Sequence, residues 1–362
     1  MSVQNWNKDI ITQVPSTRYR GSKRNILPWI FDNIKEIKFE TVLDGFGGTG
    51  SVSYLFKLMG KRVIFNDILQ SNYQIGISII ENNRYILNKN DIKFLIRQNP
   101  FDYPEFIQKN YRDIYYLNDE NEWLDMIITN INMLSQKYSG EILRKKKSLA
   151  YNALFQACLS KRPFNLFHRK NLYIRTADVP RTFYNKKIWD EKFESLFIKF
   201  AQEISTKIFN NYQKNSAICE DIINIENTYD LIYFDPPYLN SSKNDMDDYF
   251  GLYHFLEGIV DYENWGNRID ISRKNKPLKI KKLGWSKKES EIKLDKIFKN
   301  FSDSIIMMSY SDHGYPSLNR ILELLYQYKK NVRIEKIPYN YSLNNSGKNG
   351  YKLKEFLIIA NK

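Results

Sequence analysis

Short runs of apolar residues recur along the chain, and their lengths are typical of strands buried in a sheet. They occupy residues 41–44, 62–66, 230–234, 304–309, 332–337 and 355–360. Between the first two runs, residues 52–59 show a helical pattern that ends at Gly60. This β-α-β order predicts a parallel strand pair with a right-handed crossover, which is the start of a doubly wound sheet.

The last two apolar runs predict a different arrangement. A turn-rich segment, residues 344–350, separates them, so we expect an antiparallel hairpin that closes the sheet. The predicted fold class is therefore α/β, with a Rossmann-like sheet that is mostly parallel and has an antiparallel terminal hairpin.

The middle of the chain has a different character. Residues 72–216 show helical periodicity with many aromatic and basic residues and no clear strand of the main sheet. We predict that they form a mainly helical lobe inserted into a domain made of residues 1–71 and 217–362. A second stretch, residues 240 to about 289, mixes aromatic residues with lysines and is predicted to be an extended loop region beside the functional site.

The charge points to a polyanionic partner. Among 362 residues, Lys and Arg outnumber Asp and Glu by 55 to 41, which gives a formal net charge of +14. The excess recurs at residues 144–147, 168–170 and 273–282. Any one short lysine run is often only a solvated face, so the charge favours nucleic acid without identifying it.

Cysteine content and hydropathy exclude several classes of protein. Cys158 and Cys219 are far apart and match no metal-ligand spacing, so neither a disulfide framework nor a metal site is predicted. The first residues lack the pattern of a signal peptide, and no apolar stretch approaches the roughly 18 to 20 residues that span a bilayer. We expect a cytoplasmic protein that does not associate with membranes.

A glycine-rich segment joins the first predicted strand to the helix after it. Asp44 ends the strand, and Phe46, Gly48 and Gly50 lie in the turn. Glycines allow the backbone to approach a ligand closely, and the helix N-terminus offers N–H groups to an anion such as a carboxylate. The spacing differs from the dinucleotide pattern G-x-G-x-x-G, so a nucleotide-like ligand without a pyrophosphate is favoured.

Asp67 ends the second predicted strand, where an acidic side chain can accept hydrogen bonds from both hydroxyls of a ribose. The simpler interpretation is a helix N-cap before Ile68. Together with the glycine segment, the position of Asp67 favours an adenosine-binding site.

Asp235, Pro236, Pro237 and Tyr238 directly follow the third predicted strand. Two prolines cannot extend a strand ladder, so they form a rigid turn at the carboxyl end of the strand, which is the edge where open α/β sheets bind ligands. An ordinary proline turn capped by Asp235 is the structural alternative.

This segment suits methyl transfer to an aromatic amine, whose lone pair is delocalised into the ring and is a poor nucleophile. Asp235 and the carbonyl of Pro236 can each accept an N–H bond from the amine, which localises the lone pair and directs it at the methyl-sulfonium of S-adenosylmethionine. Tyr238 can stack on a base that has flipped out of a duplex.

These segments together resemble the N6-adenine DNA methyltransferases of the DNA adenine methylase (Dam-like) type, with the α-class motif order. The resemblance covers most of the chain outside residues 72–216, and it rests on residues 18–23, 46–50, 67 and 235–238. It implies S-adenosylmethionine as the cofactor, double-stranded DNA as the partner, and target recognition by the inserted lobe. A cognate restriction endonuclease is a candidate companion.

By this resemblance, Tyr19, Lys23, Asp67 and Asp235 contact the cofactor. Asp221 resembles an acidic strand end that binds the cofactor adenine. Lys23 would meet the methionine carboxylate as a point charge. Without the resemblance, Tyr19 would be interpreted as a packed aromatic residue and Lys23 as a solvated lysine.

The sequence departs from the family pattern at three places. Gly45 stands where the family more often has proline, Tyr19 stands where tryptophan is frequent, and Thr49 interrupts the glycines; none of these changes removes a group that the chemistry needs. His254 is a candidate base, but the methylated amine loses its proton without a strong base, so we expect a substrate-lining or core histidine.

The leading hypothesis is a site-specific DNA adenine N6-methyltransferase. An RNA adenine or DNA cytosine-N4 methyltransferase is the enzymatic alternative, although cytosine-N4 enzymes more often carry serine at the position of Asp235. A non-catalytic nucleic-acid-binding protein on the same fold is the third possibility. The intact segment at 235–238 and the glycines Gly48 and Gly50 argue against it.

Overall fold

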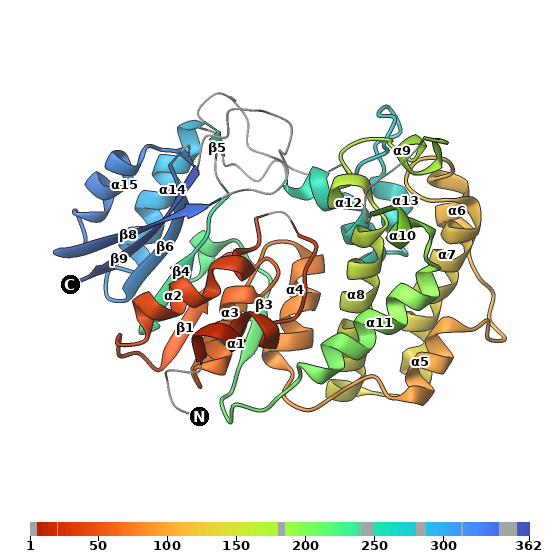
Figure 1. Cartoon of the computed structure of the whole chain (residues 1–362), viewed down its shortest axis with the longest axis horizontal. Helices are drawn as coiled ribbons and strands as arrows, with labels where there is room; N and C mark the ends of the chain where they lie inside the picture. Colours follow the sequence, from red (N-terminus) through yellow and green to blue (C-terminus); the bar gives the residue numbers. More distant parts are fainter. Residues whose placement is uncertain are drawn as a thin grey trace.

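The sheet and a helical lobe lie side by side in the molecule (Figure 1). The structure is a computed structural model, and it describes residues 6–19, 21–179, 185–237, 239–240, 249–279, 287–312, 314–339 and 353–362. None of the helices within these ranges combines the length and the apolar composition needed to cross a bilayer.

A seven-stranded sheet has the order β3-β2-β1-β4-β6-β9-β8. The strands are β1 (Thr41–Asp44), β2 (Arg62–Asn66), β3 (Ser216–Ile218), β4 (Leu231–Phe234), β6 (Ile305–Ser311), β8 (Asn331–Tyr339) and β9 (Leu353–Asn361). β1 pairs in parallel with β2 and β4, β2 with β3, and β4 with β6. Within this sheet β9 alone runs the other way, because it pairs antiparallel with both β6 and β8.

The fold class predicted from the sequence is confirmed. β1 and β2 have the predicted bounds, and α3 (Ser51–Leu58) connects them, so the β-α-β unit is present. The antiparallel terminal hairpin is also present. Its second strand is inserted between β6 and β8, so the sheet ends on β8. The predicted turn at residues 344–350 lies outside the described residues.

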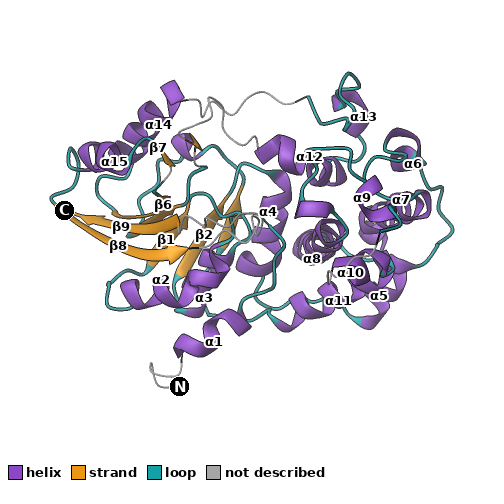
Figure 2. Ribbon diagram, turned by 45° about the horizontal axis from the view of Figure 1, so that its top comes forward, coloured by secondary structure: helices purple, strands orange, loops and turns teal. Residues whose placement is uncertain are grey.

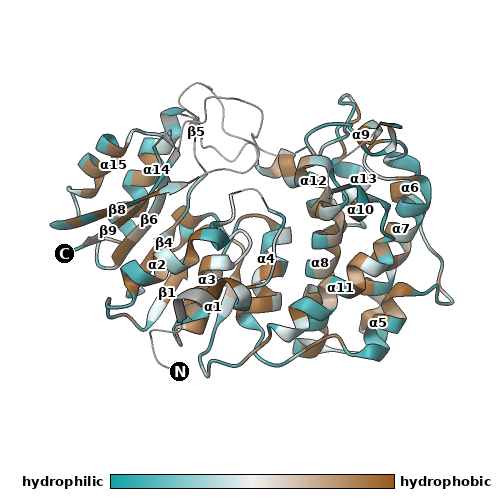
Figure 3. Cartoon of the chain, viewed as in Figure 1, coloured by the Kyte–Doolittle hydropathy of each residue, from teal (hydrophilic) through white to brown (hydrophobic). Residues whose placement is uncertain are grey.

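Two hydrophobic layers cover the two faces of the sheet because successive strand residues point to opposite sides. Val42 belongs to the cluster that includes α2 (Leu27–Ile34) and α3. The next residue, Leu43, belongs to the cluster with α14 (Lys287–Asn300) and α15 (Leu318–Leu325). The hydropathy colours follow this arrangement, with brown strands between helices that carry teal on their outer sides (Figure 3).

The helical lobe gathers on one side of the sheet (Figure 2). Between β2 and β3 the chain forms α4 (Gln70–Gly76), η3 (Ile77–Glu81), α5 (Lys89–Ile96), α6 (Phe106–Asn110), α7 (Asn118–Asn132), η4 (Met133–Gln136), α8 (Gly140–Ser160), η5 (Pro163–Asn165), α9 (Tyr173–Thr176), α10 (Asn185–Asp190) and α11 (Phe193–Thr206). The longest of these, α8, packs against α4, η3 and α11. α8 therefore joins the lobe to the sheet region.

The prediction of a loop region over residues 240–289 is wrong in its described part. α12 (Tyr249–Val260) and α13 (Trp265–Arg268) are helices, and α14 begins at Lys287. The N–H of Phe167 in the lobe donates to the carbonyl of Leu252 in α12 at 2.9 Å, and Trp265 is fully buried. The aromatic residues that suggested an irregular segment are core residues, and the lobe draws on residues 249–279 as well as on the insertion.

Short elements that the sequence did not predict complete the site region. The edge strand β3 has three residues. β5 (Leu239–Asn240) follows Pro237 closely and pairs antiparallel with β7 (Gly314–Tyr315). η2 (Lys23–Ile26) and η6 (Ile222–Asn224) are short 3-10 turns beside the sheet, and α1 (Trp6–Gln13) precedes η2. The β5–β7 pair fastens the segment after Asp235 to the segment after β6.

Gly258 in α12 offers a test of the lobe packing. A β-carbon there would lie 2.0 Å from the Trp265 ring. In a helix interior, alanine is normally more favourable than glycine by roughly 0.5–1 kcal/mol. A loss of stability in the alanine variant would therefore indicate the steric contact with Trp265. Gly258→Ala should lower the free energy of unfolding by about 1–3 kcal/mol in urea denaturation.

Gly266→Ala is the matched comparison for this test. Its nearest neighbour, the Phe106 ring, would lie 3.3 Å away, so the destabilisation should be smaller. Equal destabilisation of the two variants would contradict the packing of Gly258 on Trp265.

Candidate active site

A pocket lies at the carboxyl ends of β1, β2 and β4, which is the edge where open α/β sheets bind ligands. The residues predicted from the sequence that line it are Tyr19, Lys23, Asp44, Phe46, Gly48, Asp67, Asp221, Asp235 and Pro237. Gly50 and Pro236 are next to lining residues in the chain but do not line the pocket. Tyr238 lies outside the described residues. Segments distant in sequence therefore meet in one site.

The glycine loop after β1 has a backbone that requires glycine. Gly48 and Gly50 have φ values of 52° and 72°, in the left-handed region that costs other residues strain. Gly47, which the sequence did not single out, has no room for a side chain, because a β-carbon would lie 2.2 Å from the Phe65 ring. Gly50 is the N-cap residue of α3, so the loop presents the start of that helix to the pocket.

Asp67 holds the glycine loop in place. Its Oδ2 accepts the N–H of Gly48 at 2.8 Å and the side-chain amide of Asn72 at 3.1 Å, and its Oδ1 accepts the N–H of Leu69 at 2.9 Å. Burial raises the pKa of Asp67, and the bonds from Leu69 and Gly48 oppose that rise. The bond to Leu69 forms a turn just before α4, but Leu69 and not Asp67 is the N-cap residue of that helix. Asp67 also lines the pocket.

Asp44 is almost completely buried at the end of β1, with 1% exposure. Its Oδ2 accepts the hydroxyl of Ser53 at 2.6 Å. Its Oδ1 has no hydrogen-bond partner among the described residues. Burial raises the pKa of Asp44 to about 7, with the Ser53 bond lowering it and the charges of Asp235 and Asp67 raising it. A cationic donor placed at Oδ1 would stabilise the ionised carboxylate.

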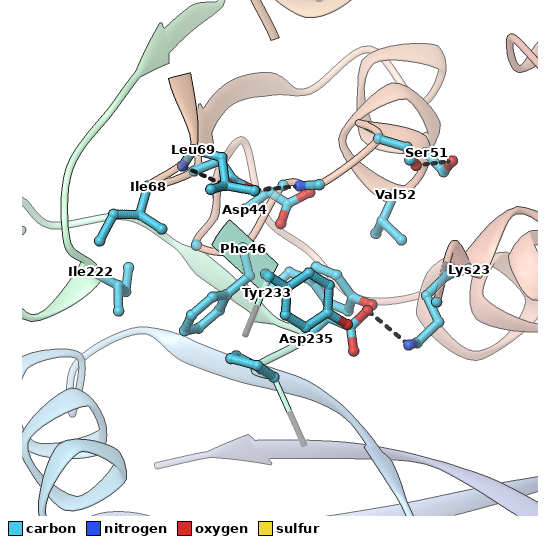
Figure 4. Close-up of a pocket in the computed structure, with 18 of the residues that line it drawn as sticks. Lys23, Asp44, Phe46, Ser51, Val52, Ile68, Leu69, Ile222, Tyr233 and Asp235 are labelled. Carbon is cyan, nitrogen blue, oxygen red and sulfur yellow. Dashed lines mark hydrogen bonds and ion pairs between the residues drawn. The ribbon is translucent and has the colours of Figure 1, made fainter. Parts of the chain in front are cut away.

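A buried ion cluster forms the other polar side of the pocket. The Lys23 ammonium lies 2.7 Å from Oδ2 of Asp235 and 3.3 Å from Oε1 of Glu355. Lys23 and Glu355 are buried, whereas the Asp235 side chain is 20% exposed. Figure 4 shows the ammonium pointing toward Asp235. Lys23 therefore has two partners within the protein in addition to the methionine carboxylate predicted for it.

Three hydroxyls meet where α3 begins, and no pattern in the sequence singles them out. Oγ of Ser22 lies 3.4 Å from Oγ1 of Thr49 and 3.2 Å from Oγ of Ser51, and the last two oxygens are 2.9 Å apart. All three residues line the pocket. Hydroxyls and free N–H groups at a helix N-terminus form a site suited to an anion.

The opposite side of the pocket is apolar. Phe46, Ile68 and Ile222 gather there, across from Lys23 and Asp235 (Figure 4). The pocket thus combines an apolar side with a polar side rich in carboxylates, as expected for an elongated ligand with an aromatic end and a charged end.

Asp221 and the buried Asn66 organise the rim of the pocket. The Asn66 amide donates to the carbonyls of Gly45 and Glu220, both at 3.1 Å, and its Oδ1 accepts the N–H of Glu220 at 3.1 Å. Asn66 thereby links the loops that follow β1 and β3. Asp221 caps η6 through the N–H of Ile223 at 3.3 Å, and its carboxylate lies 3.6 Å from the ammonium of Lys293.

Three tyrosines stack at the side of the pocket that faces the lobe. The ring of Tyr19 lies 4.2 Å from that of Tyr253, with 8° between their planes, and 6.2 Å from that of Tyr249. The Asn72 amide donates to the Tyr19 hydroxyl at 3.3 Å, and burial raises the pKa of Tyr19. Since Tyr249 and Tyr253 belong to α12, the lobe contributes directly to the pocket wall.

His254 is a core residue, which confirms one of the two expectations for it. Its Nε2 lies 2.7 Å from the Tyr115 hydroxyl and 3.3 Å from the Phe167 carbonyl. The ring is fully buried and does not line the pocket. Burial lowers the pKa of His254 to about 3, so the imidazole is neutral.

The first basic run is not a surface for a polyanion. Lys145 and Lys146 in α8 are buried and form ion pairs with Glu81 and Asp91, respectively. Arg144 also pairs with Glu81. These charges join α8 to η3 and α5, so their role is structural.

As far as the structure describes them, the other two basic runs do reach the surface, and they lie next to each other. Arg169 and Lys170 are exposed, as are Arg273 and Lys274. The Asn275 amide donates to the Phe167 carbonyl at 3.2 Å, which holds the two loops together. We refer to the exposed side chains Arg169, Lys170, Arg273 and Lys274 as the basic tip.

Over the described ranges, no group of three or more His, Cys, Asp or Glu side chains is placed to hold a metal ion. Cys158 and Cys219 are both free thiols.

Comparisons with known proteins identify the family to which the chain belongs. The family model for D12 class N6 adenine-specific DNA methyltransferases matches residues 19–302. The chain is also 30% identical over 256 residues to the Type II methyltransferase M2.HphI of Haemophilus parahaemolyticus, an alignment that covers 69% of this chain and 72% of that protein. The family expected from the sequence is confirmed. The chain belongs to the D12 class of N6-adenine-specific DNA methyltransferases, and it is an adenine-specific DNA methyltransferase.

Proposed function

We propose that this enzyme transfers a methyl group from S-adenosylmethionine to N6 of an adenine that has flipped out of double-stranded DNA within a short recognition sequence. The observation that carries the proposal is the position of Asp235, a partly exposed carboxylate in the same pocket as the glycine loop, Asp44 and Asp67. A role beside a cognate restriction endonuclease is part of the proposal, supported by the Type II relative.

The charged end of the cofactor fits the polar groups near β1. The ammonium of its methionine part would supply the missing donor to Oδ1 of Asp44. Its carboxylate would bind at the start of α3, where Ser22, Thr49 and Ser51 place their hydroxyls.

The nucleoside end of the cofactor fits the other side of the pocket. Asp67 would accept hydrogen bonds from the ribose hydroxyls, and Asp221 would accept one from the adenine amino group. Phe46, Ile68 and Ile222 would cover the adenine ring. When bound, the cofactor supplies an electrophilic methyl group on its sulfonium.

Asp235 would activate the target amine. Its carboxylate and the carbonyl of Pro236 accept the two N–H bonds of the amine, so the lone pair of N6 is directed away from the ring plane. The N6–carbon bond forms as the carbon–sulfur bond breaks. The extra proton on N6 then leaves to Asp235 or to water, because the alkylated amine is strongly acidic.

The helical lobe, which includes residues 249–279, would recognise the DNA. The basic tip presents four cationic side chains from two loops, which suits contacts to phosphates. Tyr19 and Tyr249 line the pocket where it meets the lobe, and the buried Tyr253 stacks on the Tyr19 ring. Aromatic rings at a pocket accommodate an unstacked base.

The role of Asp235 is tested by replacing it with asparagine, which keeps the size of the side chain and removes the charge. Asp235→Asn should lower the single-turnover rate of methyl transfer by about 10²- to 10³-fold. DNA affinity should change little, because the carboxylate carries no phosphate contact. A variant that transfers labelled methyl groups at the wild-type rate would refute the mechanism.

The role of Asp44 predicts a pH dependence of cofactor binding. Because its pKa lies at about 7 in the free protein, the carboxylate is protonated below that pH and cannot pair with an ammonium. The dissociation constant of S-adenosylmethionine should therefore rise below pH 7 with a limiting slope of about tenfold per pH unit. Calorimetric titrations of Asp44→Asn should show weaker binding above pH 7 and no such slope; an unchanged slope would assign it to another group.

The basic tip predicts a salt effect. Arg273→Gln combined with Lys274→Gln should weaken DNA binding and reduce the slope of log affinity against log salt by about 0.9 for each phosphate that the variant no longer neutralises. Lys38→Gln with Lys330→Gln is the control pair. These exposed lysines precede β1 and β8, at the edge of the sheet opposite the pocket. Equal reductions of the slope in both pairs would mean that the tip has no special role.

A further inference from the structure

Glu355 is a buried carboxylate near the start of β9, between the ends of β6 and β8. It lies in β9 directly across from Ser311 of β6 and Ile337 of β8, and its side chain is completely buried. Two residues later, on the same face, the chain has Leu357, also completely buried. Burying a charged side chain among apolar strand residues costs free energy unless the charge is paired. Glu355 therefore needs a cationic partner.

That partner is Lys23, and through it Glu355 reaches the active site. The Lys23 ammonium lies between Oε1 of Glu355, at 3.3 Å, and Oδ2 of Asp235, at 2.7 Å. Lys23 and Asp235 line the pocket, whereas Glu355 does not. Any effect of Glu355 on the target amine must therefore pass through Lys23.

The division of one ammonium between two carboxylates has a chemical consequence. An ammonium has three N–H donors and one charge. In an isolated Lys23–Asp235 pair the full charge would act on Asp235, which would then be a weaker acceptor for the N–H of the amine. Glu355 shares the electrostatic interaction of the Lys23 ammonium with Asp235 and holds the ammonium in place.

We propose that Glu355 is a positioning residue for methyl transfer, which holds Lys23 so that Asp235 is correctly oriented and remains a strong acceptor for the target amine. This inference rests on the proposed role of Asp235. Glu355 itself touches neither the pocket nor the substrate.

Titratable groups near Asp235 also influence how the rate of methyl transfer depends on pH. Among the described residues, Asp44 at the end of β1 and Tyr233 in β4 interact electrostatically with Asp235, in addition to Lys23. Burial, together with the charge of Asp235, raises the pKa of each. Tyr233 also shares a hydrogen bond of 2.8 Å with Ser309 of β6. From β6 and β8, the residues opposite Glu355 are uncharged.

The test measures single-turnover methyl transfer across pH with saturating DNA and S-adenosylmethionine. Glu355→Gln keeps the shape of the side chain but leaves the whole ammonium charge to Asp235. The rate should fall roughly 10- to 100-fold, and the acidic limb of the pH profile should move to lower pH by on the order of one unit. Lys23→Met should move that limb to higher pH, because the ammonium between the two carboxylates is then removed.

Two further variants separate positioning from stability. Glu355→Asp keeps the charge and should retain the wild-type acidic limb. Glu257→Gln neutralises another buried carboxylate, one that accepts N–H bonds from Gln70 and Ser71 at the start of α4, and should leave the limb in place. Thermal unfolding of each variant gives the fraction of the protein that is folded at the assay temperature.

The inference is overturned if Glu355→Gln and Lys23→Met shift the acidic limb in the same direction, or if the limb of Glu355→Gln does not move. It is also overturned if the rate falls only in proportion to the amount of folded protein. Failure of the proposed function would look different, because Asp235→Asn would then transfer methyl groups at the wild-type rate whatever the result for Glu355.

Discussion

The site depends on one constraint, which is that several carboxylates lie together at one edge of the sheet. Parallel pairing of β1 with β2 and β4 brings Asp44, Asp67 and Asp235 to the same pocket. Burial raises the pKa of Asp44 to about 7, and the neighbouring charges of Asp235 and Asp67 add to that rise. Lys23 offsets part of this charge, and a cofactor that carries a sulfonium and an ammonium would offset more. The protein fold thus creates a pocket that is electrostatically suited to a cationic ligand.

The two ends of the chain close this pocket. Residues just before η2 and within it supply Ser22 and Lys23, while β9, near the other end of the sequence, supplies Glu355. The insertion of β9 between β6 and β8 places a carboxylate one strand beyond β6. This strand order brings Glu355 to Lys23 as a second carboxylate beside Asp235.

The helical lobe serves the site in two ways. α12 brings Tyr249 and Tyr253 against Tyr19, so one wall of the pocket belongs to the lobe. The basic residues of the lobe divide into a buried set and an exposed set. Lys145 and Lys146 hold α8 against its neighbours, whereas the basic tip is open to solvent. A count of charges does not separate these sets, because burial and ion pairing are properties of the packed helices.

The sequence alone determined the sheet strands apart from short β3, the β-α-β unit, the glycine loop and the acidic strand ends, because strand periodicity, glycine conformation and proline chemistry act over a few residues. It also determined the family through short segments, each of which is continuous in the chain. Only the tertiary structure decided that residues 249–260 form a helix in the core of the lobe, that Lys145 and Lys146 of the first basic run are buried, and that β9 lies inside the sheet. It also decided that Lys23 has Glu355 as a partner. Such contacts join residues that are tens to hundreds of positions apart, and no local pattern encodes which buried charge will meet which.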